Sequence, residues 1–369
     1  MRRVQAHNAH HRQAVTEDSL IDQLLDQDTT FAAFRLPGQE VQLYLQRDKE
    51  LRSPHSGQRC FVLAPFDAAE GPALCIRPDE VRVLGAIPPV ERPEAEPRLR
   101  TAAHRGLDRG GFASAVDRAL QAIRKGEVEK VVLARTTDAD LDGLSIGALF
   151  HAATRELPDA FVAIARTARY GLWLGASPER LLTMRNEHVE VDALAGTMAA
   201  DLAPDQAMEW GLKEREEQAI VTRRIMEWLR SAGVVDGASG MPSTKRAGPV
   251  AHLRTIVRGR MNDPDPVRLA SALHPTPAVG GSPADAALDL IKRLEPRGRS
   301  LYAGYWGPMS PTGADFFVNI RCMEIHGHQA LLHVGAGITR DSVAESECDE
   351  VERKARTWLD LIDAQRAAG

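Results

Sequence analysis

Four glutamates on two predicted helices are the first residues of this sequence that could do chemistry. Within residues 205–231, the apolar stripe through Val221 and Ile225 continues upward to Glu217 and then to Glu214. A carboxylate on a face expected to be buried must be paired, protonated or bound to a metal ion. The alternative is a solvated surface, because the residues around these two glutamates are charged as well.

The predicted last helix, residues 342–365, carries a second pair of glutamates. Glu347 and Glu350 flank its apolar stripe. The stripe consists of Cys348, Val351, Ala355, Trp358 and Ile362. Magnesium takes one or two protein carboxylates and completes its shell with water and an anionic substrate. The two helices could therefore offer oxygen ligands to a hard cation, and a salt bridge from Glu350 to Lys354 is the alternative.

Two further charged residues stand at the ends of predicted strands. Lys130 precedes the apolar run 131–134, and Glu179 ends the segment 175–179 after another apolar strand. A lysine can act as a base when burial or a nearby cation lowers its pKa, and a glutamate can act as an acid when its site raises its pKa. A solvated lysine and an ordinary turn glutamate are the alternatives. Ser177 is not a nucleophile elbow, because that motif needs glycine where Glu179 stands.

An arginine and a glycine-rich segment are candidates for binding an anion. Arg321 closes the run 317–320 within the predicted strand 316–323, where a period of two places it on one face with Phe317 and Asn319. A guanidinium in such a position suits bidentate binding of a carboxylate, with a cross-strand ion pair as the alternative. Residues 335–338 predict a strand that runs into a tight turn, whose bare backbone could approach a ligand.

The composition excludes several classes of function. The 369 residues, 43% of them hydrophobic and 26% charged, suit a globular protein with a large core. The net charge of -5 and the lack of a basic stripe predict no nucleic-acid partner. The N-terminus lacks the apolar core of a signal peptide, and no apolar run approaches the roughly 18 residues of a membrane span. Four scattered cysteines fit a reducing compartment. We therefore expect a cytoplasmic protein without a membrane partner, and we take a monomer as the default.

The elements that must position these residues are mostly strands joined by short turns. Residues 161–166 and 172–175 predict neighbouring strands, and residues 316–323 and 331–335 predict another pair. A helix is expected at 111–125, and the proline-rich segment 86–100 reads as a linker or crossing loop. Paired strands and helices in blocks favour an α+β fold with antiparallel sheets over a doubly wound parallel sheet.

Taken together, these motifs resemble the family of chorismate-utilising enzymes. That family includes isochorismate synthases, salicylate synthases, anthranilate synthase large subunits and aminodeoxychorismate synthases. The resemblance covers residues 105–366 and rests on ten segments in order. They are Lys130–Arg135, Gly175–Glu179, Leu194–Thr197, Lys213–Gln218, Leu273–Ala278, Leu294–Pro296, Tyr302–Gly304, Ile320–Cys322, Gly335–Ile338 and Glu347–Lys354.

The resemblance implies one large α+β domain, a sandwich of antiparallel sheets with helices outside. Residues 1–100 would form the variable N-terminal part of this fold, and residues 101–369 the chorismate-binding catalytic region. The resemblance also implies a Mg²⁺ cofactor with Glu217 and Glu350 as ligands, and Glu214 and Glu347 acting through water or supporting them. Gln218 departs from the family pattern, which often has histidine there.

Substrate-binding residues also follow from the resemblance. The metal would hold the ring carboxylate of chorismate, with Gly196, Thr197 and His274 nearby. The enolpyruvyl carboxylate would be bound by a second group of residues. They are Arg321, Tyr302 and the backbone amides near Gly335 and Gly337, while Lys354 would support the charges of the metal and the carboxylate.

The residue at the base position of the family implies the reaction. Family members that use water carry lysine there, as Lys130 here, and those that use ammonia typically carry glutamine. Lys130 would deprotonate water for attack at ring C2, and Glu179 would protonate the leaving C4 hydroxyl. The expected activity is that of an isochorismate synthase without a glutamine amidotransferase subunit, serving for example siderophore or menaquinone biosynthesis. One alternative is a salicylate synthase. An alternative from a different functional class is a non-catalytic chorismate-binding subunit.

Overall fold

The computed structural model describes residues 17–85, 106–199, 209–247 and 250–368. Strands in this part of the chain form two large sheets in which neighbouring strands pair antiparallel. The first sheet has the order β14 (Gly281–Ser282), β6 (Lys130–Asp140), β18 (Gln329–Ile338), β17 (Cys322–His326), β8 (Gly171–Ser177), β7 (Phe161–Thr167), β1 (Thr30–Arg35), β2 (Val41–Gln46) and β5 (Glu80–Leu84).

The second sheet has the order β11 (Val235–Ser239), β13 (Val250–Arg260), β10 (His188–Ala199), β9 (Arg180–Arg185), β16 (Gly313–Val318), β15 (Tyr305–Ser310), β3 (Cys60–Ala64) and β4 (Leu74–Ile76). The short strand β12 (Ser243–Ala247) pairs with β13 beside this order. Strand β1 pairs with β7, and β3 pairs with β15, so both sheets combine strands that are far apart in the sequence. The result is one domain built on two antiparallel sheets.

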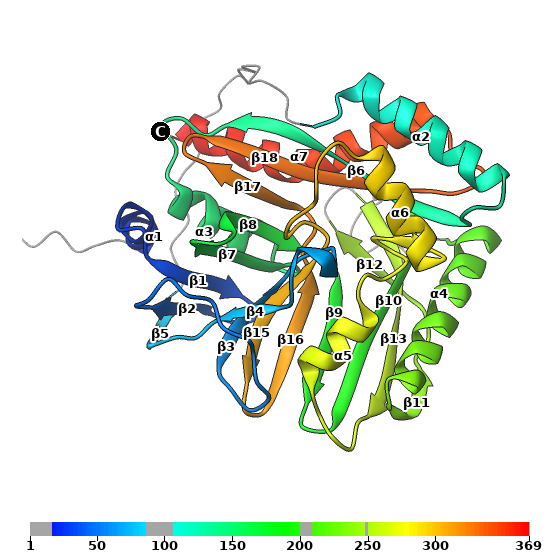
Figure 1. Cartoon of the computed structure of the whole chain (residues 1–369). Coiled ribbons are helices and arrows are strands. Elements are labelled where there is room, and N and C mark those ends of the chain that lie inside the picture. The colour runs from blue at the N-terminus through cyan, green and yellow to red at the C-terminus, as the bar shows by residue number, and fades with distance from the viewer. Residues whose placement is uncertain (1–16, 86–105, 200–208, 248–249, 369) are drawn as a thin grey trace, which may run out of the picture.

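Helices cover the outside of the two sheets (Figure 1). They are α1 (Glu17–Asp26), α2 (Arg109–Arg124), α3 (Ile146–Glu156), α4 (Leu212–Ser231), α5 (Pro266–Leu273), α6 (Ala284–Leu294), α7 (Ala344–Ala368) and a 3-10 turn (Ala68–Glu70). Helix α7 packs on β18 and against α2, while α4 runs along β10 and β13. Within the described part of the chain, no helix combines the length and apolar character needed to span a membrane.

Aromatic side chains fill the space between the sheets. The rings of Phe161 on β7 and Phe317 on β16 are stacked with their centroids 4.4 Å apart. Phe61 on β3 contacts Trp306 on β15 edge to face at 5.9 Å, and the Phe161 ring meets the same indole. These residues are buried, so the core lies where the two sheets face each other.

Local sequence signals explain where several helices begin. The side chain of Asp108 accepts a hydrogen bond from the Gly111 N–H (2.7 Å) at the start of α2, and Ser145 caps α3 in the same way. Asp265 caps α5, whose first residue is proline. A capping oxygen satisfies an N–H group that the helix itself leaves unpaired.

Most elements predicted from the sequence are confirmed. The strands at 161–166 and 172–175 are β7 and β8, which pair directly, and residues 111–125 lie within α2 or follow it by one residue. The apolar stripe of α7 is buried as predicted. The segment 86–100, predicted as a linker, lies outside the described residues.

The predicted single strand 316–323 is wrong. Residues 319–321 are not part of a strand: β16 ends at Val318 in the second sheet, and β17 starts at Cys322 in the first. Arg321 has a φ of 50°, which an extended strand does not allow. The period-two face assigned to Arg321 is therefore wrong too. Residues 335–338 also differ from the expected turn, because they lie inside β18.

The chain passes between the sheets at a second place as well. Strand β8 ends at Ser177 in the first sheet and β9 begins at Arg180 in the second, which leaves Pro178 and Glu179 at the crossover. The Val318 N–H donates to the Glu179 carbonyl oxygen (3.0 Å), and the Ala176 N–H donates to the Arg321 carbonyl oxygen (2.9 Å). The two crossovers thus lie side by side.

Candidate active site

A cavity of about 730 Å³ lies next to both crossovers. Its walls come from strands β6 and β18 of the first sheet, β10 and β13 of the second, and helices α4 and α7. Ten of the residues singled out in the sequence line this cavity. They are Lys130, Glu179, Gly196, Tyr302, Arg321, Gly335, Gly337, Glu347, Glu350 and Lys354.

Glu179 is a buried carboxyl at one side of the cavity, with 7% of its surface exposed. Burial raises the pKa of Glu179 to about 7, and the nearby Asp192 charge adds to this, while Lys245, Lys130 and Lys354 act in the opposite direction. Such a carboxyl can hold a proton near neutral pH and still release it, as a general acid must.

The backbone around Glu179 is held by hydrogen bonds. The Glu179 N–H donates to Ser177 Oγ (3.2 Å), and the Ser177 hydroxyl donates to the Val318 carbonyl oxygen (2.6 Å). The buried Ser177 hydroxyl therefore connects the two crossovers by hydrogen bonds, in agreement with the conclusion that Ser177 is not a nucleophile.

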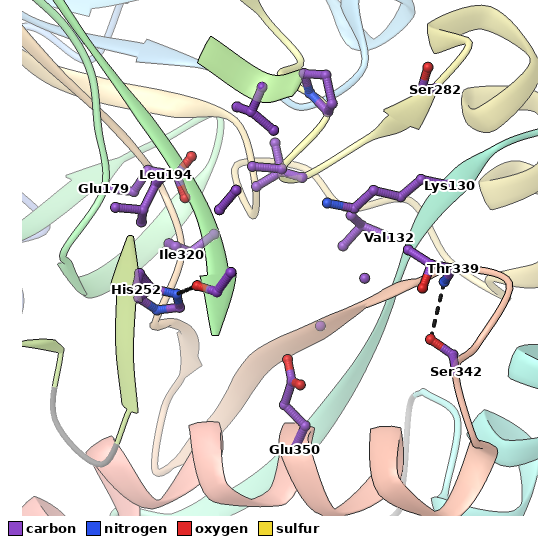
Figure 2. A pocket seen from close by; sticks show the side chains of 18 of the residues that line it. Lys130, Val132, Glu179, Leu194, His252, Ser282, Ile320, Thr339, Ser342 and Glu350 are labelled. Atoms are coloured by element: carbon purple, nitrogen blue, oxygen red, sulfur yellow. Dashed lines mark hydrogen bonds between the residues drawn. The ribbon is translucent and has the colours of Figure 1, made fainter. Parts of the chain in front are cut away.

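Lys130 lies at the start of β6, on the side of the cavity opposite Glu179 (Figure 2). Its ammonium group extends towards the Glu179 side, and Glu350 enters the cavity from α7 below them. Gly337, the partner of Val132 in the adjacent strand β18, gives the lysine room. A Cβ at Gly337 would lie 3.1 Å from Lys130 Cε, so a side chain there would push the lysine out of its path.

A buried ion pair fixes the strand that carries Lys130. The Arg299 guanidinium donates to Glu295 (2.9 Å from Nε), to the Val132 carbonyl oxygen (2.7 Å) and to the Val279 carbonyl oxygen (2.9 Å). Glu295 in turn accepts from the Ala134 N–H (2.9 Å). The pair thus ties β6 to the loop around Val279, which forms another wall of the cavity.

Arg321 supplies a buried cation to the cavity. One guanidinium nitrogen donates to Thr357 Oγ1 (2.8 Å), and the Arg321 carbonyl oxygen accepts from the Trp358 indole N–H (2.7 Å). Burial lowers the pKa of Arg321 to about 10, with the Glu350 charge acting against this, so the guanidinium stays charged at neutral pH. A charged group in this position can bind a carboxylate.

Tyr302 and His333 form the aromatic wall beside Arg321. Their rings are stacked with centroids 5.1 Å apart, and both line the cavity. Burial lowers the pKa of His333 to about 3, so its ring is neutral, and burial also raises the pKa of Tyr302. Gly335 makes room for this wall, because a Cβ there would lie 2.6 Å from the Tyr302 hydroxyl oxygen.

Lys354 links α7 to β18 at the edge of the cavity. Its ammonium donates to Glu350 Oε1 (2.6 Å) and to the Gly335 carbonyl oxygen (2.8 Å). The salt bridge considered as an alternative for Glu350 is therefore present. Burial by itself would raise the pKa of Glu350, but the Lys354 charge and hydrogen bond hold it below its ordinary value. Glu350 is ionised at neutral pH.

The predicted metal ligands are brought together only in part. Glu347 and Glu350 both line the cavity from α7. Glu214 on α4 packs on the backbone of Gly196, where an added Cβ would lie 3.1 Å from Glu214 Cβ. The Glu217 side chain lies outside the described residues. No group of three or more histidine, cysteine, aspartate or glutamate residues suited to a metal ion occurs among those described.

The donor chemistry on α7 nonetheless fits a hard cation. The carboxylates of Glu347 and Glu350, one helical turn apart, offer oxygen atoms only. Magnesium prefers oxygen ligands and needs only one or two of them from the protein. The convergence of all four glutamates on Mg²⁺ stays a prediction.

One residue predicted to bind substrate, His274, is not part of this cavity wall. His274 ends α5, and its Nε2 lies 3.2 Å from the Phe66 carbonyl oxygen. Its ring packs edge to face against Phe66 and Tyr305, and burial lowers its pKa to about 4. The apolar packing around α5 therefore accounts for His274, which does not line the cavity. Thr197 was also predicted to bind substrate, and its side chain lies outside the part of the chain that the structure describes.

Sequence reasoning missed His252, which lines the cavity from β13. Its Nδ1 lies 3.2 Å from the Gly196 carbonyl oxygen, and burial lowers its pKa to about 4. The signal was available in the sequence, because the apolar residues Ala251 and Leu253 alternate with the polar residues His252 and Arg254. That period of two predicts a strand that presents His252 and Arg254 on one face.

Comparison with known proteins identifies relatives of this chain. Residues 82–363 match the family described as chorismate binding enzyme. The chain is 34% identical over 265 residues to isochorismate synthase MenF of Escherichia coli, covering 69% of this chain and 61% of that protein. It is 33% identical over 265 residues to the salicylate biosynthesis isochorismate synthase of Pseudomonas aeruginosa, covering 70% and 56%. The chain thus spans less than two thirds of the length of these two relatives.

Solved structures show the same architecture. The menaquinone-specific isochorismate synthase MenF of Escherichia coli has a TM-score of 0.78 at 26% identity, covering 90% of this chain and 88% of that one. A protein from Bacillus anthracis named putative 2,3-dihydroxybenzoate-specific isochorismate synthase DhbC has a TM-score of 0.76 at 23% identity, covering 93% of this chain and 99% of that one. At that identity, the second likeness supports the fold alone.

Proposed function

The chain belongs to the family of chorismate-binding enzymes, and from this premise we propose that it is an isochorismate synthase, an isomerase that converts chorismate to isochorismate. The observation that carries the proposal is the placement of Lys130 and Glu179 on opposite sides of one cavity. A base on one side and an acid on the other suit a reaction in which one hydroxyl enters a ring and another leaves it. Two relatives, from Escherichia coli and Pseudomonas aeruginosa, are named isochorismate synthases, which agrees with this reaction.

In the proposed reaction, Lys130 takes a proton from water as the water oxygen bonds to ring C2. The ring double bond shifts, the C4–O bond breaks, and Glu179 gives its proton to the leaving hydroxyl. The high pKa of Glu179 supports the acid role, because the carboxyl can hold this proton near neutral pH. One water enters and one leaves, so the substrate and the product are isomers.

Arg321 and Lys354 are the residues we assign to the carboxylates of chorismate. Both line the cavity, and the Arg321 guanidinium is held in place through Thr357. Chorismate carries two carboxylates, so a cavity with buried cations matches its charge. Glu347 and Glu350, with Glu214 and Glu217 of α4, would hold Mg²⁺. When bound, this ion would supply the positive charge that fixes the ring carboxylate.

Identification of the product tests the proposal. Purified protein incubated with chorismate and Mg²⁺ should release isochorismate, without added ammonia or glutamine, since Lys130 is suited to activate water. Stoichiometric pyruvate and salicylate would instead make the protein a salicylate synthase. Chorismate that binds but stays unchanged would make it a binding protein.

A further inference from the structure

A cluster of charged residues outside the cavity wall surrounds the segment that carries Glu179. Its centre is Asp192 on β10, whose side chain has no exposed surface. Arg180, the residue after Glu179, donates to Asp192 (2.7 Å), and Arg254 on β13 does so through two nitrogens (2.8 and 2.9 Å). The predicted acid is thus followed directly by a residue anchored in a buried ion pair.

Lys245 completes this cluster from the short strand β12. Its ammonium donates a hydrogen bond to the carbonyl oxygen of Pro178, the residue before Glu179. The same nitrogen lies 3.9 Å from Asp192 Oδ2, and 18% of the side chain is exposed. Lys245 is not among the residues that line the cavity. Lys245 therefore fixes the segment at Pro178, on the side away from the cavity, while Arg180 fixes it on the other side of Glu179 through Asp192.

The charges around Glu179 come from four elements. Asp192 on β10 raises the pKa of Glu179, whereas Lys245 on β12, Lys130 on β6 and Lys354 on α7 lower it. Burial lowers the pKa of Lys245, and the charges of Asp192 and Glu179 oppose this effect. Of these three lysines, only Lys245 lies outside the cavity wall, so it can act on Glu179 without touching a substrate.

We propose that Lys245 is a positioning residue for Glu179: it fixes the Pro178–Glu179 peptide through the Pro178 carbonyl oxygen and places a balancing cation beside the buried carboxyl. The proposal rests on the proposed function for the meaning of that carboxyl as an acid. It assigns Lys245 no contact with substrate. The position and charge environment of the acid would then depend on β12, the short strand that pairs with β13 beside the main order of the second sheet.

Three variants separate this role from a general effect on folding. Lys245→Met keeps most of the side-chain length and removes the ammonium, and Lys245→Arg restores a cation and a donor. Lys292→Met is the matched control, because Lys292 also pairs with an aspartate, Asp67 (2.6 Å), but on α6 outside the cavity wall. The protonation of Glu179 is read directly by infrared difference spectroscopy during a pH titration, with Glu179→Gln identifying the carboxyl band.

In the wild-type protein, the Glu179 band should titrate near pH 7. In Lys245→Met the midpoint should move upward by about one pH unit, the usual scale for loss of a nearby opposite charge. The arginine variant should return the midpoint towards the wild-type value, and the Lys292 control should leave it unchanged. An unchanged midpoint in a folded Lys245→Met protein, or the same shift in both methionine variants, would overturn the proposal.

Turnover gives the second readout. Because Lys245 does not line the cavity, Lys245→Met should lower kcat by about tenfold, a part of the roughly 10²- to 10⁴-fold help of an acid, and leave KM near its wild-type value. A rise in KM with unchanged kcat would contradict a role through Glu179. If wild-type protein did not convert chorismate at all, the proposed function would fail, while the infrared titration would still decide the role of Lys245.

Discussion

The backbone N–H of Val318 donates a hydrogen bond of 3.0 Å to the carbonyl oxygen of Glu179, and this bond joins the two places where the chain passes from one sheet to the other. Glu179 lies at the first crossover and Arg321 at the second. The carboxyl and the guanidinium therefore take their relative position from a hydrogen-bonded backbone and not from the ends of flexible loops. Such support is what a site needs to hold reacting groups in a fixed geometry.

The acid and the base should each be needed for turnover. Glu179→Gln removes the proton that the leaving hydroxyl requires, and Lys130→Met removes the group that deprotonates water. Each change should lower kcat by at least roughly 10²-fold, a common size for general acid–base help. Steady-state kinetics at saturating chorismate measures this. Glu187→Gln and Lys125→Met, at exposed positions, are the matched controls, and wild-type rates in both test variants would show that the two residues are structural.

The buried Glu179 should also make the fold less stable as pH rises. Its pKa is about 7 in the folded protein against an ordinary 4.5, so the folded state binds more protons between these values. The free energy of unfolding then falls as pH rises from about 4.5 to about 7 and levels off above. Glu179→Gln removes this term, so its stability relative to wild type should increase over that range by about 3 kcal/mol.

Urea unfolding of wild type and Glu179→Gln, at about pH 5 and about pH 8, measures the difference. Buried histidines such as His274 and His333, whose pKa values burial lowers to about 4 and about 3, change stability in the opposite sense, but they are present in both proteins. A stability difference that does not change with pH would mean that Glu179 is ionised throughout.

Some residues of this site could be predicted from the sequence, and others could not. Lys130 and Glu179 were predicted from the apolar runs beside them in the sequence, and such runs are local signals of strands. The buried stripe of α7 follows from its helical period. The side-by-side crossovers could not be predicted in this way, because the mostly apolar segment 316–323 has the pattern of one strand, and only pairing with distant strands divides it before Cys322.

The histidines show a second limit. His274 and His252 both stand in apolar surroundings of the sequence, and the motif around His274 attracted the prediction. Whether a histidine faces a cavity depends on which element packs over it. His274 is enclosed by Phe66 and Tyr305, whereas His252 lies on the face of β13 that meets the cavity. The role of Lys245 had no sequence signal either, since its contact with Pro178 joins residues 67 positions apart.

Arg321 should contribute to binding more than to the chemical step. Arg321→Lys keeps a positive charge but loses the planar pair of donors that suits a carboxylate. We expect KM for chorismate to rise by about tenfold or more, with a smaller change in kcat, because a charge-assisted hydrogen bond contributes about 1.5 to 3 kcal/mol. Arg356→Lys on the exposed face of α7 is the control. Equal KM values in both variants would remove Arg321 from the substrate site.

Magnesium should be required for turnover and should act through the glutamates of α4 and α7. Chelation should abolish conversion of chorismate, and added Mg²⁺ should restore it. Glu350→Gln should weaken the apparent affinity for Mg²⁺ while the protein stays folded, because removing one of several neighbouring carboxylates relieves repulsion in the absence of the ion. Titration of activity against Mg²⁺ measures this, with Asp360→Asn as the control. Full activity in excess chelator would contradict the metal assignment.

Incorporation of oxygen from solvent is the most direct test of the central claim, that water activated by Lys130 attacks C2 as Glu179 protonates the hydroxyl at C4. The measurement is mass spectrometry of the isochorismate formed from unlabelled chorismate in ¹⁸O-enriched water. Each product molecule should gain one ¹⁸O atom, carried at C2, and Lys130→Met should form labelled product far more slowly. Isochorismate without ¹⁸O would contradict the attack of water, because the hydroxyl would then have moved within the substrate and no water would have been activated.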